Sequence, residues 1–524
     1  ENLQPFRYIS DTFVSYNIDS SYTQPQQSTG MPHENYEGEF HMRRKTIFLK
    51  MVIGALLLSI LSGCGKKAGV DYIQENDSRQ DAVSASDLHL NYSVSNGHTT
   101  VNVDADVNTS LSTQSAPVAT AVRCDYTNED ITRIAAAIFD EGSYKLFLPY
   151  SHQSKEDITA ACDAFAETFA TYADKSEIPY NLLAECSYAQ NAKDGGVFDP
   201  IETNGTIQYY PTIKPSADSE EFCNFCNIRG TINGKDCQLS FVQTRKHCML
   251  VLHKDYNEEL TYGLFNQLSP IRPDMLETLA GSDNICSYST EGASTLVTDT
   301  LSRMGINDYV VTDVFPTQTI RTVYDISSTY QVTANYDKEP VISYDSYLVY
   351  GGRSLDALTP VYTTANFQPE LTDYESMDQD ENGTISNYED YTFYGYESIT
   401  ANVGNDGLNY LIVSNPMKIE TIDVDMANTL DFSQVDAIAQ DYINKHTFDE
   451  TVYDITDIRY GLIRLSNEAD DSYQLLPAWY YVAEGNEESK PYYFPSAYVV
   501  INAIDGSIYN NELGYIYQHR NKSD

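Results

Sequence analysis

The sequence predicts an α+β fold made of modules in which a helix is followed by an antiparallel sheet. Three observations predict it. Apolar residues recur at helical spacing behind capping residues, other segments alternate apolar and polar residues as strands do, and turn pairs such as Asn233-Gly234 and Asp505-Gly506 suit hairpins. The order of a helix and then strands occurs at least twice, which indicates repeated units behind a first α+β domain.

The first α+β domain is expected at residues 85–286. Alternating apolar residues at 101–107 predict a strand, and Thr127 with Asp130 forms a capping-box pattern before a helix that continues to Ile138. A second helix is predicted at 155–172. A strand meander at 223–253 then closes the domain.

Two further modules are expected at 287–425 and 426–518. In the first, a helix at 293–304 ends at Gly305, since glycine adopts the positive φ common at helix ends. Its predicted strands are 308–314, 330–336, 346–350 and 398–403. In the second, Ser433 caps a helix, and strands are predicted at 458–465, 474–483 and 497–503.

The segment before the first domain has the form of an export signal. A basic cluster at 43–45 precedes an apolar run at 51–61, which is shorter than the ~20 residues a membrane-spanning helix needs. Leu61-Ser62-Gly63-Cys64 closes the run and resembles the bacterial lipobox, which implies a cut before a diacylated Cys64. The alternative is a buried apolar helix with a chance cysteine, but the basic flank and the polar spacer favour lipidation.

The export signal divides the start of the chain. We expect a non-native upstream extension at 1–41, a lipoprotein signal peptide that begins at Met42 and covers 42–63, and a flexible tether at 64–84. The lipid on Cys64 makes the membrane the first partner, because acyl chains hold a domain stably at a bilayer. The expected location is the cell membrane, with the chain lipid-anchored and facing the extracellular side.

The chain is strongly acidic. It has 76 Asp and Glu against 32 Lys and Arg, a formal net charge of -44. This balance argues against nucleic acid as a partner, because phosphate contacts need clustered Lys and Arg. Two interpretations of the charge remain: solubility at a crowded anionic surface, and the binding of divalent cations.

All cysteines lie in the first part of the chain. Besides Cys64 there are eight: Cys124, Cys162, Cys186, Cys223, Cys226, Cys237, Cys248 and Cys286. An even number in an exported segment predicts at least one disulfide, with its connectivity open. The pair Cys223 and Cys226 also has a spacing found in zinc sites, but residues three apart on a strand point to opposite faces. A thioredoxin-like redox site is disfavoured too, since no βαβ pattern surrounds the pair.

Residues 378–389 fit the twelve-residue calcium loop of EF-hands at every position. Gly383 permits the sharp turn, Ile385 fills the apolar position, and oxygen ligands stand at the required spacing. The predicted ligands are Asp378, Asp380, Asn382, Thr384, Ser386 and Glu389. The alternative is an acidic turn on an acidic protein. A lone loop of this kind is expected to bind calcium weakly, with a dissociation constant of ~10⁻⁴ to 10⁻³ M as in extracellular modules. The bound calcium would have a structural role and hold a long connection in place.

A family resemblance rests on the end of the chain. Residues 475–480 followed by 500–508 resemble the final two strands of PepSY-type modules, which are exported modules also found in ectodomains that act on sensor kinases. From about residue 85, the chain is similar to an uncharacterised family of clostridial-type Gram-positive surface lipoproteins. That match rests on 101–107, the helix after Thr127, 396–399 with Asp406-Gly407, and the terminal strands. The resemblance implies PepSY-like modules, but it does not imply any particular activity.

The sequence predicts a non-enzymatic role in the cell envelope. It has no H-E-x-x-H, no G-x-S-x-G and no P-loop, and its nine histidines are scattered. We therefore expect a lipoprotein that binds or regulates an envelope protein or cell-wall component. The alternatives are a lipoprotein that captures glycan or peptide, and an unrecognised hydrolase. The 43 tyrosines fit a sugar-binding platform but also the half-buried faces of sheets.

Overall fold

The computed structural model describes the chain in segments between residues 88 and 516. They are 88–97, 100–108, 115–173, 178, 180–195, 200–211, 223–244, 247–254, 266–271, 286–321, 323–326, 332–335, 337–356, 358–361, 378–379, 385–387, 394, 396–445, 452–467, 472–484, 496–510 and 515–516. All of them belong to one of the two units into which the chain divides. In these segments we find no helix with the length and apolar character needed to cross a membrane.

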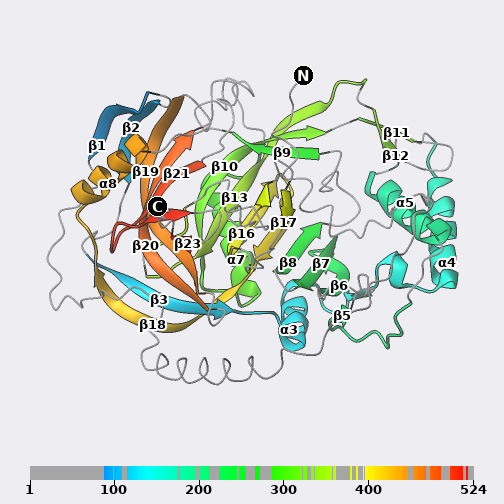
Figure 1. The fold of residues 1–524 in the computed structure, drawn as a ribbon. Helices are drawn as coiled ribbons and strands as arrows, with labels where there is room; N and C mark the ends of the chain where they lie inside the picture. The colour runs from blue at the N-terminus through cyan, green and yellow to red at the C-terminus, as the bar shows by residue number, and fades with distance from the viewer. Residues whose placement is uncertain are drawn as a thin grey trace, which may run out of the picture. The chain divides into compact units, whose positions relative to one another are not determined.

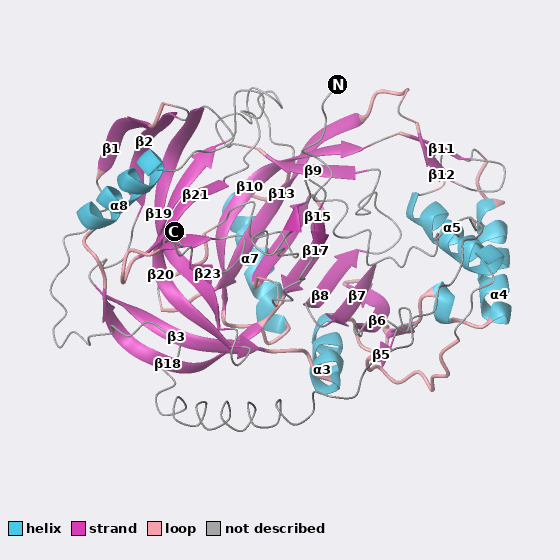
Figure 2. Cartoon of the chain, viewed as in Figure 1, coloured by secondary structure: helices cyan, strands magenta, loops and turns pink. Residues whose placement is uncertain are grey.

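The described residues form an α+β protein, as expected, in which helices accompany two large sheets (Figures 1 and 2). The described helices are α3 (Asn128–Ile138), α4 (Lys155–Phe169), α5 (Tyr180–Gly195), α7 (Thr290–Arg303), α8 (Phe432–Lys445) and the short 3-10 helix η1 (Tyr150–His152). α4 and α5 pack against each other.

The first sheet is mixed and unites the two ends of the described chain. Its strands are β1 (His89–Ser95), β2 (Thr100–Asn108), β3 (Ser115–Arg123), β18 (Met417–Asn428), β19 (Val452–Asn467), β20 (Ser472–Glu484), β21 (Ser496–Asn502), β22 (Ile508–Asn510) and β23 (Tyr515–Ile516). β2 and β19 pair in parallel, and they lie side by side in blue and orange in Figure 1. β3 pairs with β18 and with the first residues of β20.

The second sheet is antiparallel and is built from the middle of the chain. Its order is β4-β6-β7-β8-β17-β16-β13-β10-β9, with β5 beside β6. The strands are β4 (Lys145–Phe147), β5 (Tyr210–Pro211), β6 (Cys223–Ile232), β7 (Lys235–Thr244), β8 (Cys248–Lys254), β9 (Asn266–Pro270), β10 (Tyr309–Arg321), β13 (Val341–Arg353), β16 (Ser398–Gly404) and β17 (Gly407–Ser414). Two small ladders pair β11 (Tyr324–Ile326) with β12 (Val332–Ala334), and β14 (Asp378–Gln379) with β15 (Ile385–Asn387).

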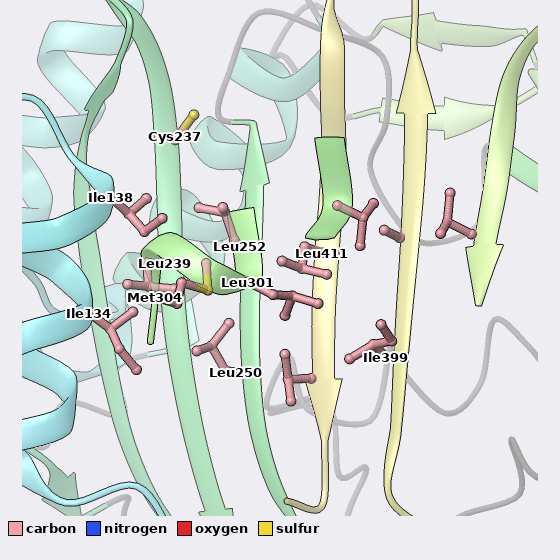
Figure 3. Close-up of a cluster of buried hydrophobic side chains, with 14 of the residues drawn as sticks. Ile134, Ile138, Cys237, Leu239, Leu250, Leu252, Leu301, Met304, Ile399 and Leu411 are labelled. Carbon is pink, nitrogen blue, oxygen red and sulfur yellow. The ribbon is translucent and has the colours of Figure 1, made fainter. Parts of the chain in front are cut away.

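Each large sheet has its own helix-covered core. Apolar side chains of α3 and α7 pack on the antiparallel sheet, as Figure 3 shows for Ile134, Ile138, Leu301 and Met304 against the strands. α8 packs on the mixed sheet through Val435, Ala439 and Ile443. The only tryptophan, Trp479 on β20, is fully buried in this second core, which confirms that it is a core residue.

Local predictions agree well with these elements. Thr127 and Asp130 form the predicted capping box at the start of α3. Asn233 and Gly234, with φ of 53° and 75°, make the predicted hairpin turn between β6 and β7. α8 begins slightly earlier than expected, because the carbonyl of Asp431 accepts the N–H groups of Gln434 and Val435. α5 is not among the predicted helices, because its sequence as a whole is only weakly amphipathic. Leu183, Cys186 and Ala189 nevertheless form a buried face.

Strand pairing crosses the boundaries expected at 286 and 425. The antiparallel sheet joins β8 directly to β17, with Leu252 opposite Leu411. The mixed sheet joins β2 to β19, with Val103 opposite Ile455. Strands from 89–123 therefore share a sheet with strands from 417–516, and the first domain does not have a sheet of its own.

Candidate functional site

The two sites predicted from the sequence fall mainly outside the described residues. Cys64 lies outside them, as do Asp380, Asn382, Thr384 and Glu389 of the calcium loop. The backbone is described at Asp378 and Ser386, where β14 and β15 pair Asp378 with Asn387. Where the structure is described, no group of three or more His, Cys, Asp or Glu side chains is placed to hold a metal ion.

Most cysteines of the described residues are buried, and Cys124 is exposed. Cys124, Cys162, Cys186, Cys226 and Cys248 are free thiols, so the expected disulfide does not form among these five. Burial raises the pKa of Cys226 and of Cys248 to about 12. A thiol with such a pKa stays protonated at neutral pH, and these two are therefore poor nucleophiles and poor metal ligands.

The most enclosed ionic group of the described chain is the pair formed by Arg353 and Glu397. Arg353 is the last residue of β13, and Glu397 immediately precedes β16. Their side chains are only 7% and 8% exposed, and Arg353 Nε lies 3.0 Å from Glu397 Oε2. Arg353 Nη2 also donates to Oε1 at 3.0 Å, which makes the pair bidentate.

Arg353 and Glu397 together hold the backbone of Met417, the first residue of β18. Arg353 Nη2 donates to the Met417 carbonyl, and the Met417 N–H donates to Glu397 Oε1 at 2.8 Å. Tyr309 Oη donates to the same carboxylate oxygen. An ion pair of the antiparallel sheet thus satisfies both backbone groups of a residue in the mixed sheet.

The electrostatics of this cluster favour the charged pair. Burial lowers the pKa of Arg353, but the charge and hydrogen bonds of Glu397 outweigh this effect and raise the pKa above its ordinary value. Burial, followed by the negative charge of Glu397, raises the pKa of Tyr309 well above its usual range. Tyr309 therefore remains a protonated hydrogen-bond donor.

A second buried arginine lies on the other side of the same junction. Arg464, on β19, is 7% exposed, and its guanidinium lies 4.4 Å from the ring centroids of both Tyr396 and Tyr473. Its Nη2 donates to the carbonyl of Tyr394 at 2.7 Å. Stacking on two rings fixes the plane of the guanidinium group.

Arg353 and Arg464 contact the inter-sheet seam, a cluster of buried residues contributed by both sheets, through Met417 and Tyr473. Its members are Ala119, Ala121, Cys248, Leu355, Tyr394, Met417, Tyr473 and Leu475. A small pocket of about 50 Å³ opens beside the seam, between residues of β13 and residues of β19 and β20. Its lining is Tyr350, Arg353, Pro360, Tyr396, Glu397, Met417, Leu462, Ile463, Arg464, Leu475 and Tyr480.

Sequence reasoning did not single out this site. Glu397 lies within a motif that the family resemblance used, but no function was attached to it. A usable signal was present: Arg464 stands between the apolar residues Ile463 and Leu465 in a predicted strand, and a charge in such a place needs partners. The identity of those partners cannot be read locally, because they lie on other strands.

No family model and no curated protein matches this chain. It is distantly similar in structure to an uncharacterised protein from Eubacterium rectale, with 11% identity, a TM-score of 0.34, and coverage of 80% of this chain and 93% of that one. It is also distantly similar to the Bacillus megaterium YpeB C-terminal domain, with 9% identity, a TM-score of 0.21, and coverage of 59% and 89%.

Proposed function

We propose that this chain is a lipid-anchored protein of the cell surface that acts as a non-enzymatic binding or regulatory module of the envelope. The observation that carries the proposal is Leu61-Ser62-Gly63-Cys64, which follows a basic cluster and a short apolar run. Cleavage before a diacylated Cys64 holds the rest of the chain at the outer face of the membrane. The partner is then an envelope protein or a cell-wall component.

The C-terminal half of the mixed sheet is proposed to be a PepSY-like module. Support comes from the pairing of the two segments that resemble this family: β20 and β21 are neighbours, with Trp479 opposite Ile501. α8 precedes these strands and covers them. The order of α7 followed by β10, β13, β16 and β17 has the same plan, which supports a repeated unit.

The buried charges of the described chain support a structural role for the inter-sheet seam. Glu397 accepts from Arg353, Tyr309 and the Met417 backbone. A carboxylate with its lone pairs committed in this way is a poor general base. The seam is therefore better suited to hold two sheets together than to carry out acid–base chemistry.

The loop at 378–389 is proposed to bind one calcium ion with a structural role. Its ligand spacing supports this, and the antiparallel pairing of Asp378 with Asn387 supports a closed loop at its two ends. Calcium bound there would pin the connection between β13 and β16, the two strands that carry Arg353 and Glu397 to the seam.

The anchor is tested with Cys64→Ala, which leaves the folded domains unchanged. We expect this variant to lose fatty-acid labelling and to leave the membrane fraction. A Cys64→Ala protein that stays in the membrane fraction, or parent protein without labelling, would overturn the proposed anchor.

The class of function is tested by complementing a strain that lacks the gene. A regulator of a membrane-bound partner needs its anchor, so we expect the released Cys64→Ala form to fail where the anchored form succeeds. A hydrolase of soluble substrates, or a protein that only captures ligand, would complement when released into the medium. Full complementation by the released form would therefore contradict the regulatory function.

A further inference from the structure

The start of β1 is attached to β2 by a histidine that bridges two carboxylates. His89 Nδ1 lies 2.9 Å from Asp106 Oδ1, and His89 Nε2 lies 3.1 Å from Asp104 Oδ1. The strand register explains both contacts. His89 is paired with Asp106, and Asp104 lies two residues along β2 on the same face of the sheet. One imidazole ring therefore contacts two side chains of the neighbouring strand.

The two contacts together require a protonated imidazole. A carboxylate only accepts hydrogen bonds, and a neutral imidazole has a single N–H, so it can donate to one of the two aspartates. Its other nitrogen would then direct a lone pair at a carboxylate oxygen. An imidazolium ion donates from both nitrogens, and the geometry therefore favours the charged form of His89.

The electrostatics of the ring agree with this geometry. The hydrogen bond to Asp106 is the largest influence and raises the pKa of His89 above its ordinary value of 6.5. The charges of Asp106 and Asp104 act in the same direction, and the loss of solvent around the ring opposes the change without reversing it. The charge of His89 therefore changes close to neutral pH.

The other charged groups around the ring have partners of their own. α8 packs on the opposite face of the sheet. β19 carries two further aspartates on the face of the ring, in register with β2. Asp454 accepts from Asn102 Nδ2 at 2.9 Å, and Asp457 pairs with Arg459. The ring is thus held by the two aspartates of β2.

The bridge lies where a weak interaction has a local effect. Among the described strands, β1 stands at one end of the mixed sheet and pairs with β2 alone (Figure 1). The side chains of His89, Asp104 and Asp106 are 53%, 70% and 83% exposed, so solvent screens their contacts and global stability depends little on them. The end of an outer strand opens far more easily than the whole protein unfolds.

We infer that His89 is a proton-dependent clamp, which closes the start of β1 onto β2 when the imidazole is charged and releases it when the imidazole is neutral. Because folding raises the pKa, the stabilisation is complete below 6.5 and is lost as the pH rises through the folded value. Release would break the bond of 2.8 Å from the Val107 N–H to the Leu88 carbonyl. The inference goes beyond the proposed function and depends on neither the lipid anchor nor the calcium loop.

The first test is an NMR titration of the histidine side chains in the full chain. His89→Gln identifies the signal of His89 by its disappearance. The pKa of His89 should lie above 6.5 in the parent, and both Asp106→Asn and Asp104→Asn should lower it. Asp454→Asn is the matched control, because it removes a carboxylate from the same face that bonds to Asn102. It should change the pKa of His89 less than either of the other two.

The second test measures the release itself. Amide hydrogen exchange is followed at about pH 5 and about pH 8, corrected for the intrinsic effect of pH, with the amides of β20 as an internal reference. In the parent, the protection of the amides at the start of β1 should be lower at the higher pH. In His89→Gln, which has no titrating group at this position, it should be the same at both.

Three results would overturn the inference. The first is a pKa of His89 at or below 6.5 in the parent. The second is an equal effect of Asp454→Asn and Asp106→Asn on that pKa, which would assign the shift to the general charge of the face. The third is a protection of β1 that depends on pH to the same extent in the parent and in His89→Gln.

Discussion

Tyr92 and Tyr481 donate to the same carboxylate oxygen of Asp436, at 2.7 Å and 3.0 Å. Tyr92 lies on β1 and Tyr481 on β20, so one side chain of α8 holds strands from both ends of the described chain. Gln440 donates to the other oxygen at 2.8 Å. Burial and the charge of Asp436 raise the pKa of both tyrosines, which keeps their hydroxyl groups protonated as donors.

Tyr92→Phe should lower the free energy of unfolding by about 1.5–3 kcal/mol, the range for a hydrogen bond to a charged group. Urea unfolding measures this loss. In a Tyr481→Phe background the second hydroxyl is already absent, and the cost of Tyr92→Phe should change, because the two donors share one acceptor. Strictly additive losses would show that the shared oxygen does not couple them.

Removal of either partner of the Arg353–Glu397 pair should be strongly destabilising. Arg353→Met or Glu397→Gln leaves a buried group without its ionic partner, at a cost of about 3–5 kcal/mol. The double variant Arg353→Met/Glu397→Gln should cost clearly less than the sum of the two single changes. Chemical unfolding of all the variants gives the coupling energy.

Lys445 provides the control for that cycle. It pairs with Asp441 along α8, and both side chains are more than 60% exposed. Lys445→Ala should change stability by no more than about 0.5 kcal/mol, as exposed pairs do. Equal losses at Lys445 and at Arg353 would contradict a special role for the buried pair.

Gly461→Ala should disrupt the contact between β19 and the segment at 358–361. An added Cβ would lie 2.5 Å from Val361 Cγ2 and 2.8 Å from the Thr359 carbonyl oxygen. The neighbouring Leu462 N–H donates to that same oxygen, so the segment cannot move away without a loss. We expect a destabilisation of about 1–3 kcal/mol in urea unfolding.

Gly195→Ala is the matched control, because an added Cβ there meets nothing within 4 Å. It should leave stability unchanged or raise it slightly. A Gly461→Ala protein as stable as Gly195→Ala would mean that the segment at 358–361 adjusts freely.

Asp140 should make stability depend on pH in the acid range. Its carboxylate accepts from the Gly234 N–H at 2.9 Å and from Thr231 Oγ1 at 2.7 Å. Both hydrogen bonds lower the pKa of Asp140, and the bond from Gly234 has the larger effect. A lowered pKa means that the stabilisation is complete above the unfolded value of 3.8 and is lost as pH falls through the folded value.

The measurement is the melting temperature of the parent and of Asp140→Asn between pH 7 and pH 2. The parent should be the more stable at pH 7, and the difference should shrink as pH falls below about 4. A difference that is constant across this range would show that the charge of Asp140 is not responsible.

Calcium at millimolar concentration should raise the melting temperature if 378–389 binds it. A ligand that binds only the folded state raises the free energy of unfolding by ~2.7 kcal/mol when its concentration is a hundred times its dissociation constant. Magnesium should act more weakly, because it resists a seven-oxygen shell, and a chelator should reverse the calcium effect. Calorimetry with Asp378→Ala/Glu389→Gln is the control, and calcium binding equal to that of the parent would assign the effect to the acidic surface.

Local sequence is sufficient for much of the secondary structure. Thr127 and Asp130 cap α3 through atoms three residues apart, and Asn233 with Gly234 turns a hairpin through its own φ angles. Such features need no distant partner, which is why they can be read from short stretches. The export signal and the calcium loop are local patterns of the same kind and stay predictions, since they fall mainly outside the described residues.

The sheets and the seam depend on partners that are distant in the chain. β2 pairs with β19, and Glu397 meets Arg353 and Met417, because apolar faces and buried charges must find complementary groups wherever the fold brings them. No short stretch carries that information: a strand shows by its alternation that one face is buried, but not which strand lies beside it. The sequence therefore predicts that residues 89–123 are part of a first domain. In the structure these strands bury their apolar face in a sheet that they share with the C-terminal strands.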